Sequence, residues 1–145
     1  TRHPKKLVTV RLDLNYYSLD TYYERLKTVF KSLTTPTIAL GFSMGGSAVW
    51  RLACSHQPML SRAIGFYASQ IRHYSDLRPR VAIHLVFPQS EDHFSVSNLM
   101  AELQNTPQVS LQQTPYAHGF MNALSTGFDP QGYQAFIDYL ADELS

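Results

Sequence analysis

The sequence has a single cysteine, few charged residues and no long apolar run. The lone Cys54 excludes an internal disulfide and fits a reducing compartment. Lys and Arg together number 12 and Asp and Glu 11, and the basic residues are scattered apart from three near the start, so nothing indicates a nucleic-acid surface. No apolar run approaches the ~20 residues that a membrane span needs, and the start lacks the apolar segment of a signal peptide. We therefore expect a cytoplasmic protein that binds neither nucleic acid nor membrane.

What the chain does contain is one regular alternation of strand and helix patterns. Its 145 residues, 44% of them hydrophobic, suffice for one core, so we expect a single domain over residues 1–145. A capping box of Thr21 and Glu24 precedes the first helical pattern. The alternation predicts an α/β fold of three layers, with a mostly parallel sheet of about five strands and helices on both faces. The expected strands are 7–13, 37–40, 63–68, 81–87 and 108–114, and the expected helices are 19–33, 47–56, 96–103 and 130–144.

The segment Gly41-Phe42-Ser43-Met44-Gly45 has the pattern G-x-S-x-G. In this pattern a sharp turn from strand to helix holds a serine hydroxyl clear of the backbone, and glycines stand where a side chain would collide with the turn. An apolar strand pattern precedes it and a helix pattern follows, as the turn requires. Ser43 is therefore the candidate nucleophile, although an ordinary turn serine can produce the same short string.

A carboxylate and a histidine follow in the order that an α/β-hydrolase requires. Asp92 comes after the expected strand 81–87, and His118 comes after the expected strand 108–114. Glu91 adjoins Asp92 and is the alternative acid; Asp92 is the preferred one. The predicted catalytic residues are therefore Ser43, Asp92 and His118.

This arrangement assigns one chemical task to each group. His118 would accept the Ser43 proton during attack and return it to the leaving group, while Asp92 would hold the imidazole in the correct tautomer. The backbone N–H of Met44, directly after the nucleophile, is the expected oxyanion donor. Such a site transfers acyl groups from esters, lactones or thioesters to water. It needs no cofactor, and the other histidines lack a paired metal-ligand spacing, so we expect no metal site.

Three motifs together resemble the dienelactone hydrolase family of α/β-hydrolases. They are GFSMGG at Ser43, SEDHFSV at Asp92 and YAHGFMN at His118, and the similarity runs from about Leu7 to the C-terminus. The resemblance implies the same three residues as nucleophile, acid and base. Family members use cysteine or serine as the nucleophile, and this chain has serine.

The expected substrate differs from dienelactone. Enzymes that hydrolyse dienelactone anchor its carboxylate with arginines, one of them four residues after the histidine, where this chain has Asn122. The segment LDLNYYS, where the other is expected, has no arginine either. A neutral or aromatic ester fits better, with Tyr16, Tyr17 and Phe120 as candidate pocket walls. Packing is the alternative role for the two tyrosines.

Only one expected strand, 7–13, precedes the strand that leads to Ser43, so about a third of a full α/β-hydrolase fold is missing. The usual neighbour of the strand before the serine would be absent, leaving backbone groups unpaired. Either the first strand shifts inward, or another chain fills the gap and makes a homo-oligomer, or the sequence is part of a longer protein. The missing strands also leave a second functional hypothesis open, a hydrolase-like domain that binds a ligand or partner without catalysis.

Overall fold

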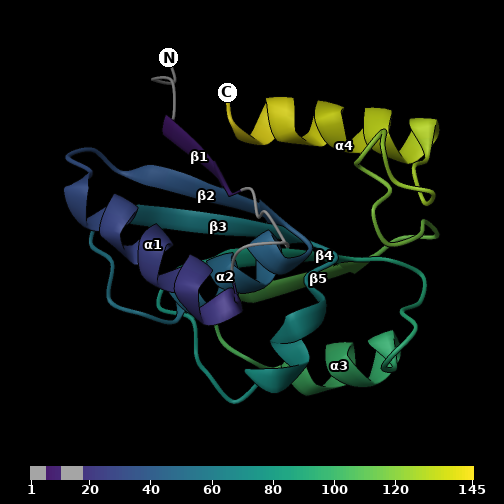
Figure 1. The fold of residues 1–145 in the computed structure, drawn as a ribbon, viewed down its shortest axis with the longest axis horizontal. Helices are drawn as coiled ribbons and strands as arrows, with labels where there is room; N and C mark the ends of the chain where they lie inside the picture. Colours follow the sequence, from purple (N-terminus) through teal and green to yellow (C-terminus); the bar gives the residue numbers. More distant parts are fainter. Residues whose placement is uncertain (1–5, 11–17) are drawn as a thin grey trace.

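A parallel five-stranded sheet forms the centre of the structure, a computed structural model that describes residues 6–10 and 18–145 (Figure 1). The strands lie side by side in chain order, and the helices connect or follow them. This confirms the expected α/β architecture. The strands are β1 (Lys6–Val10), β2 (Thr37–Phe42), β3 (Leu60–Phe66), β4 (Ile83–Phe87) and β5 (Val109–Gln113). The helices are α1 (Leu19–Ser32), α2 (Met44–Ala53), the short 3-10 helix η1 (Ser69–His73), α3 (Val96–Leu103) and α4 (Pro130–Glu143).

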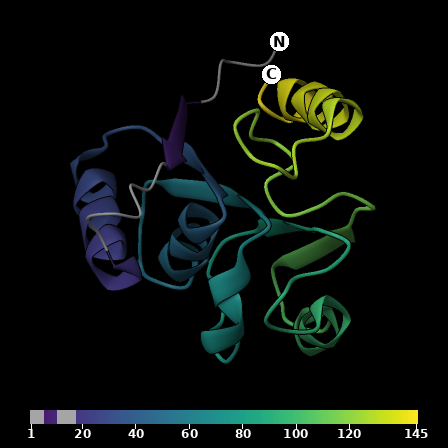
Figure 2. The ribbon, with the colours of Figure 1, turned by 45° about the vertical axis from the view of Figure 1, so that its right-hand side comes forward.

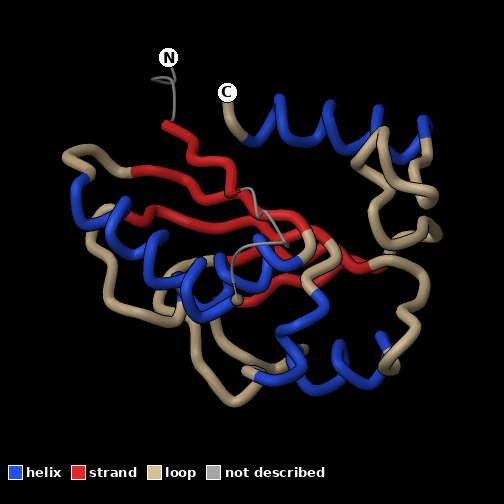
Figure 3. The backbone as a smooth tube through the Cα atoms, in the orientation of Figure 1, coloured by secondary structure: helices blue, strands red, loops and turns tan. Residues whose placement is uncertain are grey.

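The helices cover the two faces of the sheet unequally. Parallel strands that follow one another in one direction, joined by right-handed crossovers, place every connecting helix on the same face. Accordingly α1, α2 and α3 lie on one side of the sheet and α4 lies on the other (Figures 1 and 2). Two separate apolar cores result: one contains Trp50 of α2 and Leu99 of α3, and the other contains Phe136 of α4. The three layers are also clear in the tube view (Figure 3).

The first strand lies directly beside the strand that leads to Ser43. β1 pairs with β2 in parallel from Lys6 opposite Thr37 to Val10 opposite Gly41. The expected gap is therefore closed by an inward shift of β1, and β2 has a strand on each side. As a result, β2 pairs with β1 on one side and with β3 on the other, within this chain.

Helix starts follow local capping chemistry. At α1 the N-cap is Ser18, whose hydroxyl accepts a hydrogen bond from the Thr21 backbone N–H, so the expected capping box at Thr21 and Glu24 is wrong. Glu24 forms an ion pair with Lys27 instead. Asp129 caps α4 ahead of Pro130, as the sequence predicts. Among the described residues, no helix has the length and apolar character needed to cross a membrane.

Candidate active site

Ser43 lies in a sharp turn between β2 and α2. Its backbone has φ 55° and ψ −122°, a left-handed conformation that is rare for a residue with a side chain. The Ser43 N–H donates to the Phe66 carbonyl of β3 at 2.8 Å, which fixes the turn to the sheet. Gly41 is required because a Cβ there would collide with the Gly45 carbonyl. The G-x-S-x-G pattern thus forms the expected strained turn.

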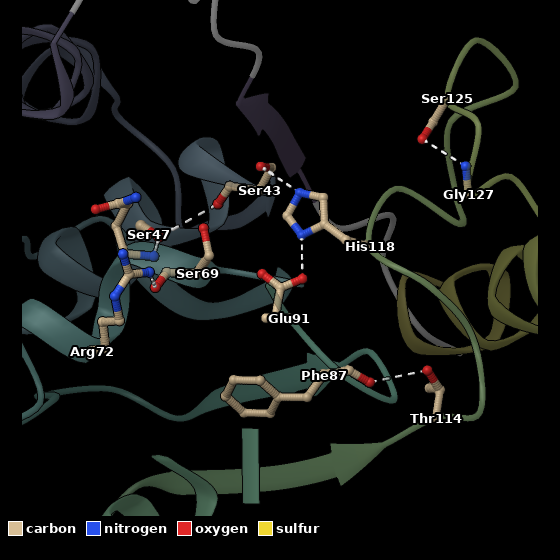
Figure 4. Close-up of polar contacts among 11 residues, drawn as sticks. Ser43, Ser47, Ser69, Arg72, Phe87, Glu91, Thr114, His118, Ser125 and Gly127 are labelled. Atoms are coloured by element: carbon tan, nitrogen blue, oxygen red, sulfur yellow. Dashed lines mark hydrogen bonds and ion pairs between the residues drawn. The ribbon is translucent and has the colours of Figure 1, made fainter. Parts of the chain in front are cut away.

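Ser47, which is buried and lies four residues after Ser43 in α2, stabilises the strand-to-helix turn by hydrogen bonds. Its backbone N–H donates to the Ser43 carbonyl at 3.1 Å, and its hydroxyl accepts from the Gln70 N–H at 3.0 Å. The second bond ties the nucleophile helix to η1, which begins beyond the end of β3 (Figure 4). Through these two bonds, Ser47 links the Ser43 carbonyl to η1.

The Ser43 hydroxyl, the His118 imidazole and the Glu91 carboxylate form one row (Figure 4). Ser43 Oγ lies 3.0 Å from His118 Nε2, and His118 Nδ1 lies 2.7 Å from Glu91 Oε1. A carboxylate only accepts, so Nδ1 carries the hydrogen and donates it to Glu91. In the neutral ring Nε2 then accepts from the Ser43 hydroxyl, which is the arrangement that a general base requires.

These three residues come together at the carboxyl ends of the strands, because Ser43 follows β2, Glu91 follows β4 and His118 follows β5. The Glu91 side chain is 8% exposed and that of His118 is 40% exposed. The carboxylate is therefore shielded from water while the imidazole is accessible. A shielded carboxylate acts on the ring through little intervening solvent, which strengthens its electrostatic effect.

The acid that contacts the imidazole is Glu91 and not Asp92. The expectation that Asp92 holds this place is wrong in the structure, where Asp92 is exposed. The two residues are neighbours in an irregular loop after β4, and the loop turns only the first of them toward His118. Sequence spacing alone does not resolve which of two adjacent carboxylates points inward.

His118 lies at the start of a tightly folded loop between β5 and α4. Gly119 has φ +84°, and a Cβ on Gly127 would collide with the His118 carbonyl oxygen. The Ser125 hydroxyl accepts from the Gly127 N–H at 3.1 Å, which closes the loop on itself (Figure 4). The Asp129 N–H donates to the Phe120 carbonyl at 3.2 Å, at the point where α4 begins. These contacts fix the backbone that carries the imidazole.

Tyr67, which the sequence reading does not assign to the site, follows β3 directly and packs against the imidazole. The ring centroids of Tyr67 and His118 lie 4.8 Å apart. Burial raises the pKa of the Tyr67 phenol to about 12, and a hydrogen bond with the Met121 backbone opposes that shift. The position of Tyr67 in the sequence could have indicated this role, because it directly follows a strand, and residues at the carboxyl ends of parallel strands line the site in open α/β sheets.

The remaining predicted site residues have different outcomes. Phe120 was an expected pocket wall, but it is fully buried and its ring packs against Phe66 and Phe136, so it is a core residue. Tyr16 and Tyr17 lie outside the described residues. Met44 is the first residue of α2, where backbone N–H groups have no partner within the helix, so its role as oxyanion donor stays a prediction.

A parallel sheet with a strained serine turn, and with a histidine and an acid on loops after later strands, defines the α/β-hydrolase class. The sequence comparison is more specific. The dienelactone hydrolase family matches residues 14–141, and the chain belongs to this family. The Bacillus subtilis (strain 168) protein YczH, which is uncharacterized, is 28% identical over 134 residues. That match covers 86% of this chain and 65% of YczH, so the chain spans less than two thirds of its relative's length.

Solved structures share the fold at low sequence identity. A Klebsiella pneumoniae protein predicted to be a dienelactone hydrolase has a TM-score of 0.69 at 14% identity, over 89% of this chain and 62% of that one. Mouse alpha/beta hydrolase domain-containing protein 10 has a TM-score of 0.61 at 13% identity, over 92% and 73%. Est1E from Butyrivibrio proteoclasticus, bound to ferulic acid, has a TM-score of 0.61 at 12% identity, over 88% and 69%. At these identities the likeness concerns the fold alone.

Proposed function

We propose that this protein is a serine hydrolase that acts on a small ester, lactone or thioester. The observation that carries the proposal is the row from Ser43 Oγ to His118 Nε2 at 3.0 Å and from His118 Nδ1 to Glu91 Oε1 at 2.7 Å. Membership of the dienelactone hydrolase family supports a hydrolase as the general class. The ester substrate and the catalytic roles are the proposal itself.

The reaction proceeds in two acyl transfers. Ser43 Oγ attacks the substrate carbonyl as its proton passes to His118 Nε2, and Glu91 stabilises the imidazolium that forms. The Met44 N–H donates to the developing oxyanion. His118 then protonates the leaving group, which departs and leaves an acyl group on Ser43. Water attacks that acyl group as His118 takes its proton. His118 then returns the proton to Ser43 Oγ as the acyl–oxygen bond breaks, which releases the acid product.

The substrate that fits best is uncharged near the histidine. Asn122 stands where dienelactone-cleaving enzymes carry an arginine, and its side-chain oxygen accepts from the Leu124 N–H at 2.9 Å within its own loop. An amide engaged in this way supplies no positive charge to a substrate carboxylate. We therefore propose neutral or aromatic esters, with Tyr16 and Tyr17 as proposed contacts. A cytoplasmic location stays a prediction from the single Cys54.

A fluorophosphonate probe tests the proposal, because it labels only a serine whose hydroxyl is activated. We expect labelling at Ser43 in the wild-type protein, loss of labelling in Ser43→Ala and strongly reduced labelling in His118→Ala. Ser97→Ala is the matched control, since this serine is exposed on α3 and is not in the row. If Ser43 is unlabelled in folded wild-type protein, or if p-nitrophenyl acetate turnover is unchanged in Ser43→Ala, the proposal fails.

A further inference from the structure

Tyr67 lies where it can control the orientation of the imidazole. It is 3% exposed and its ring is tilted by 53° against that of His118, with centroids 4.8 Å apart. The imidazole is otherwise held by hydrogen bonds to Ser43 and Glu91, which fix its two nitrogens but leave its ring face open. An aromatic ring in contact with the imidazole restricts the remaining rotation of the side chain.

The backbone of Tyr67 has a strained conformation at the position where its ring contacts the imidazole. Its φ is +38°, an uncommon value for a bulky residue. The Tyr67 N–H donates to the Val86 carbonyl of β4 at 2.7 Å, which keeps the residue attached to the sheet while its ring turns toward the site. Strained conformations of this kind persist only where the surroundings impose them, and they gather at functional sites.

Three further aromatic rings pack against the Tyr67 ring. Phe120 lies 5.6 Å from it, Phe42 lies 6.2 Å and Phe66 lies 6.5 Å, as measured between ring centroids. Phe120, and Met121 whose backbone lowers the pKa of the Tyr67 phenol, belong to the loop that carries His118. One residue thus contacts both the imidazole and the loop that carries it.

We propose that Tyr67 is a positioning residue that keeps the His118 ring in line between Glu91 and Ser43. The inference rests on the proposed hydrolase function, because it assigns Tyr67 a role in that same site. Tyr67 takes no proton and touches no reacting atom. It acts by keeping Nε2 pointed at the Ser43 hydroxyl, since a small misplacement of a catalytic group costs much of the rate.

The test compares Tyr67→Phe with Tyr67→Leu in ester turnover. Tyr67→Phe keeps the ring and loses only the phenol hydroxyl, so we expect a fall in kcat of less than about fivefold. Tyr67→Leu removes the ring, and we expect kcat to fall by roughly ten- to hundredfold with KM nearly unchanged. In the His118→Ala background Tyr67→Leu should cause no further loss, because a residue that acts through the imidazole has no effect without it.

Three results would overturn this role while leaving the hydrolase proposal intact. They are full activity in Tyr67→Leu, an equal loss with and without His118, and failure of Tyr67→Phe to retain activity. If Tyr67→Leu does not fold, Tyr67→Met, which fills more of the space, takes its place. Independently of activity, NMR of the wild-type protein should give a cross-peak between the two rings, and its absence refutes the contact. Failure of Ser43 labelling in the wild-type protein would instead refute the hydrolase proposal.

Discussion

At the scale of single residues, the site depends on two side chains held in uncommon backbone conformations. Ser43 at the end of β2 and Tyr67 at the end of β3 both have positive φ, at 55° and 38°. Each such conformation costs on the order of 1–3 kcal/mol. The hydrogen bonds from Ser43 N to Phe66 O and from Tyr67 N to Val86 O offset part of this cost, because each ties its residue to the next strand. The hydrogen bonds to the neighbouring strands thus stabilise both strained residues at the carboxyl ends of the strands.

The adjacent carboxylates Glu91 and Asp92 give a sharp test of the residue assignments. We expect Glu91→Gln to lower kcat by a factor on the order of 10²–10⁴, because the amide neither fixes the imidazole tautomer nor stabilises its charge. Asp92→Asn is the matched control and should leave kcat within about twofold of the wild type, since it is exposed. Steady-state hydrolysis of p-nitrophenyl acetate measures both. The reverse ranking of the two variants would restore Asp92 as the acid.

At the scale of elements, the sequence predicts what depends on pattern and misses what depends on the direction of a side chain. Apolar runs identify all five strands, and G-x-S-x-G places Ser43 correctly, because both patterns are local. Phe120 was expected at the pocket, yet it is buried, since proximity to His118 in the chain does not say which way a loop residue turns. The expected helix begins at residue 19, as observed, but its capping residue is wrong for a similar reason: Ser18 and Thr21 are both good caps, and the fold selects between them.

The loop from Gly119 to Phe128 is the element that sets the position of the histidine, and Gly127→Ala tests it. A Cβ at this position collides with the His118 carbonyl oxygen, so the loop must shift. We expect kcat to fall by about 10²-fold while the overall fold is retained. Leu124→Ala is the control in the same loop, because Leu124 is 96% exposed and should be neutral. Circular dichroism together with ester kinetics checks both variants, and equal activities would show that the loop tolerates the shift.

At the scale of the whole molecule, burial of weak acids makes stability depend on alkaline pH. Burial raises the pKa of Cys54 to about 12 from 9.0 and that of Tyr67 to about 12 from 10.0. Above pH 9 the unfolded chain releases protons that the folded protein keeps, so the free energy of unfolding falls as pH rises toward 12. Each group contributes at most about 1.4 kcal/mol per pH unit, and Cys54 less because it is only partly buried.

Urea unfolding at pH 8, 9, 10 and 11 measures this dependence. We expect the unfolding free energy to be constant near pH 8 and to decline at higher pH. Cys54→Ala should flatten the decline that begins near pH 9, and Tyr67→Phe should flatten the part that begins near pH 10. A wild-type stability that stays level to pH 11 would contradict the burial of both groups.

The strand order carries a consequence for how the molecule assembles. Because β1 to β5 lie in the sheet as they occur in the chain, each strand docks beside one that has already been made. The sheet can therefore grow in chain order as the strands are synthesised. The Ser43 turn is translated 75 residues before His118. A nascent chain therefore carries Ser43 without its proposed base until the segment around His118 has been made.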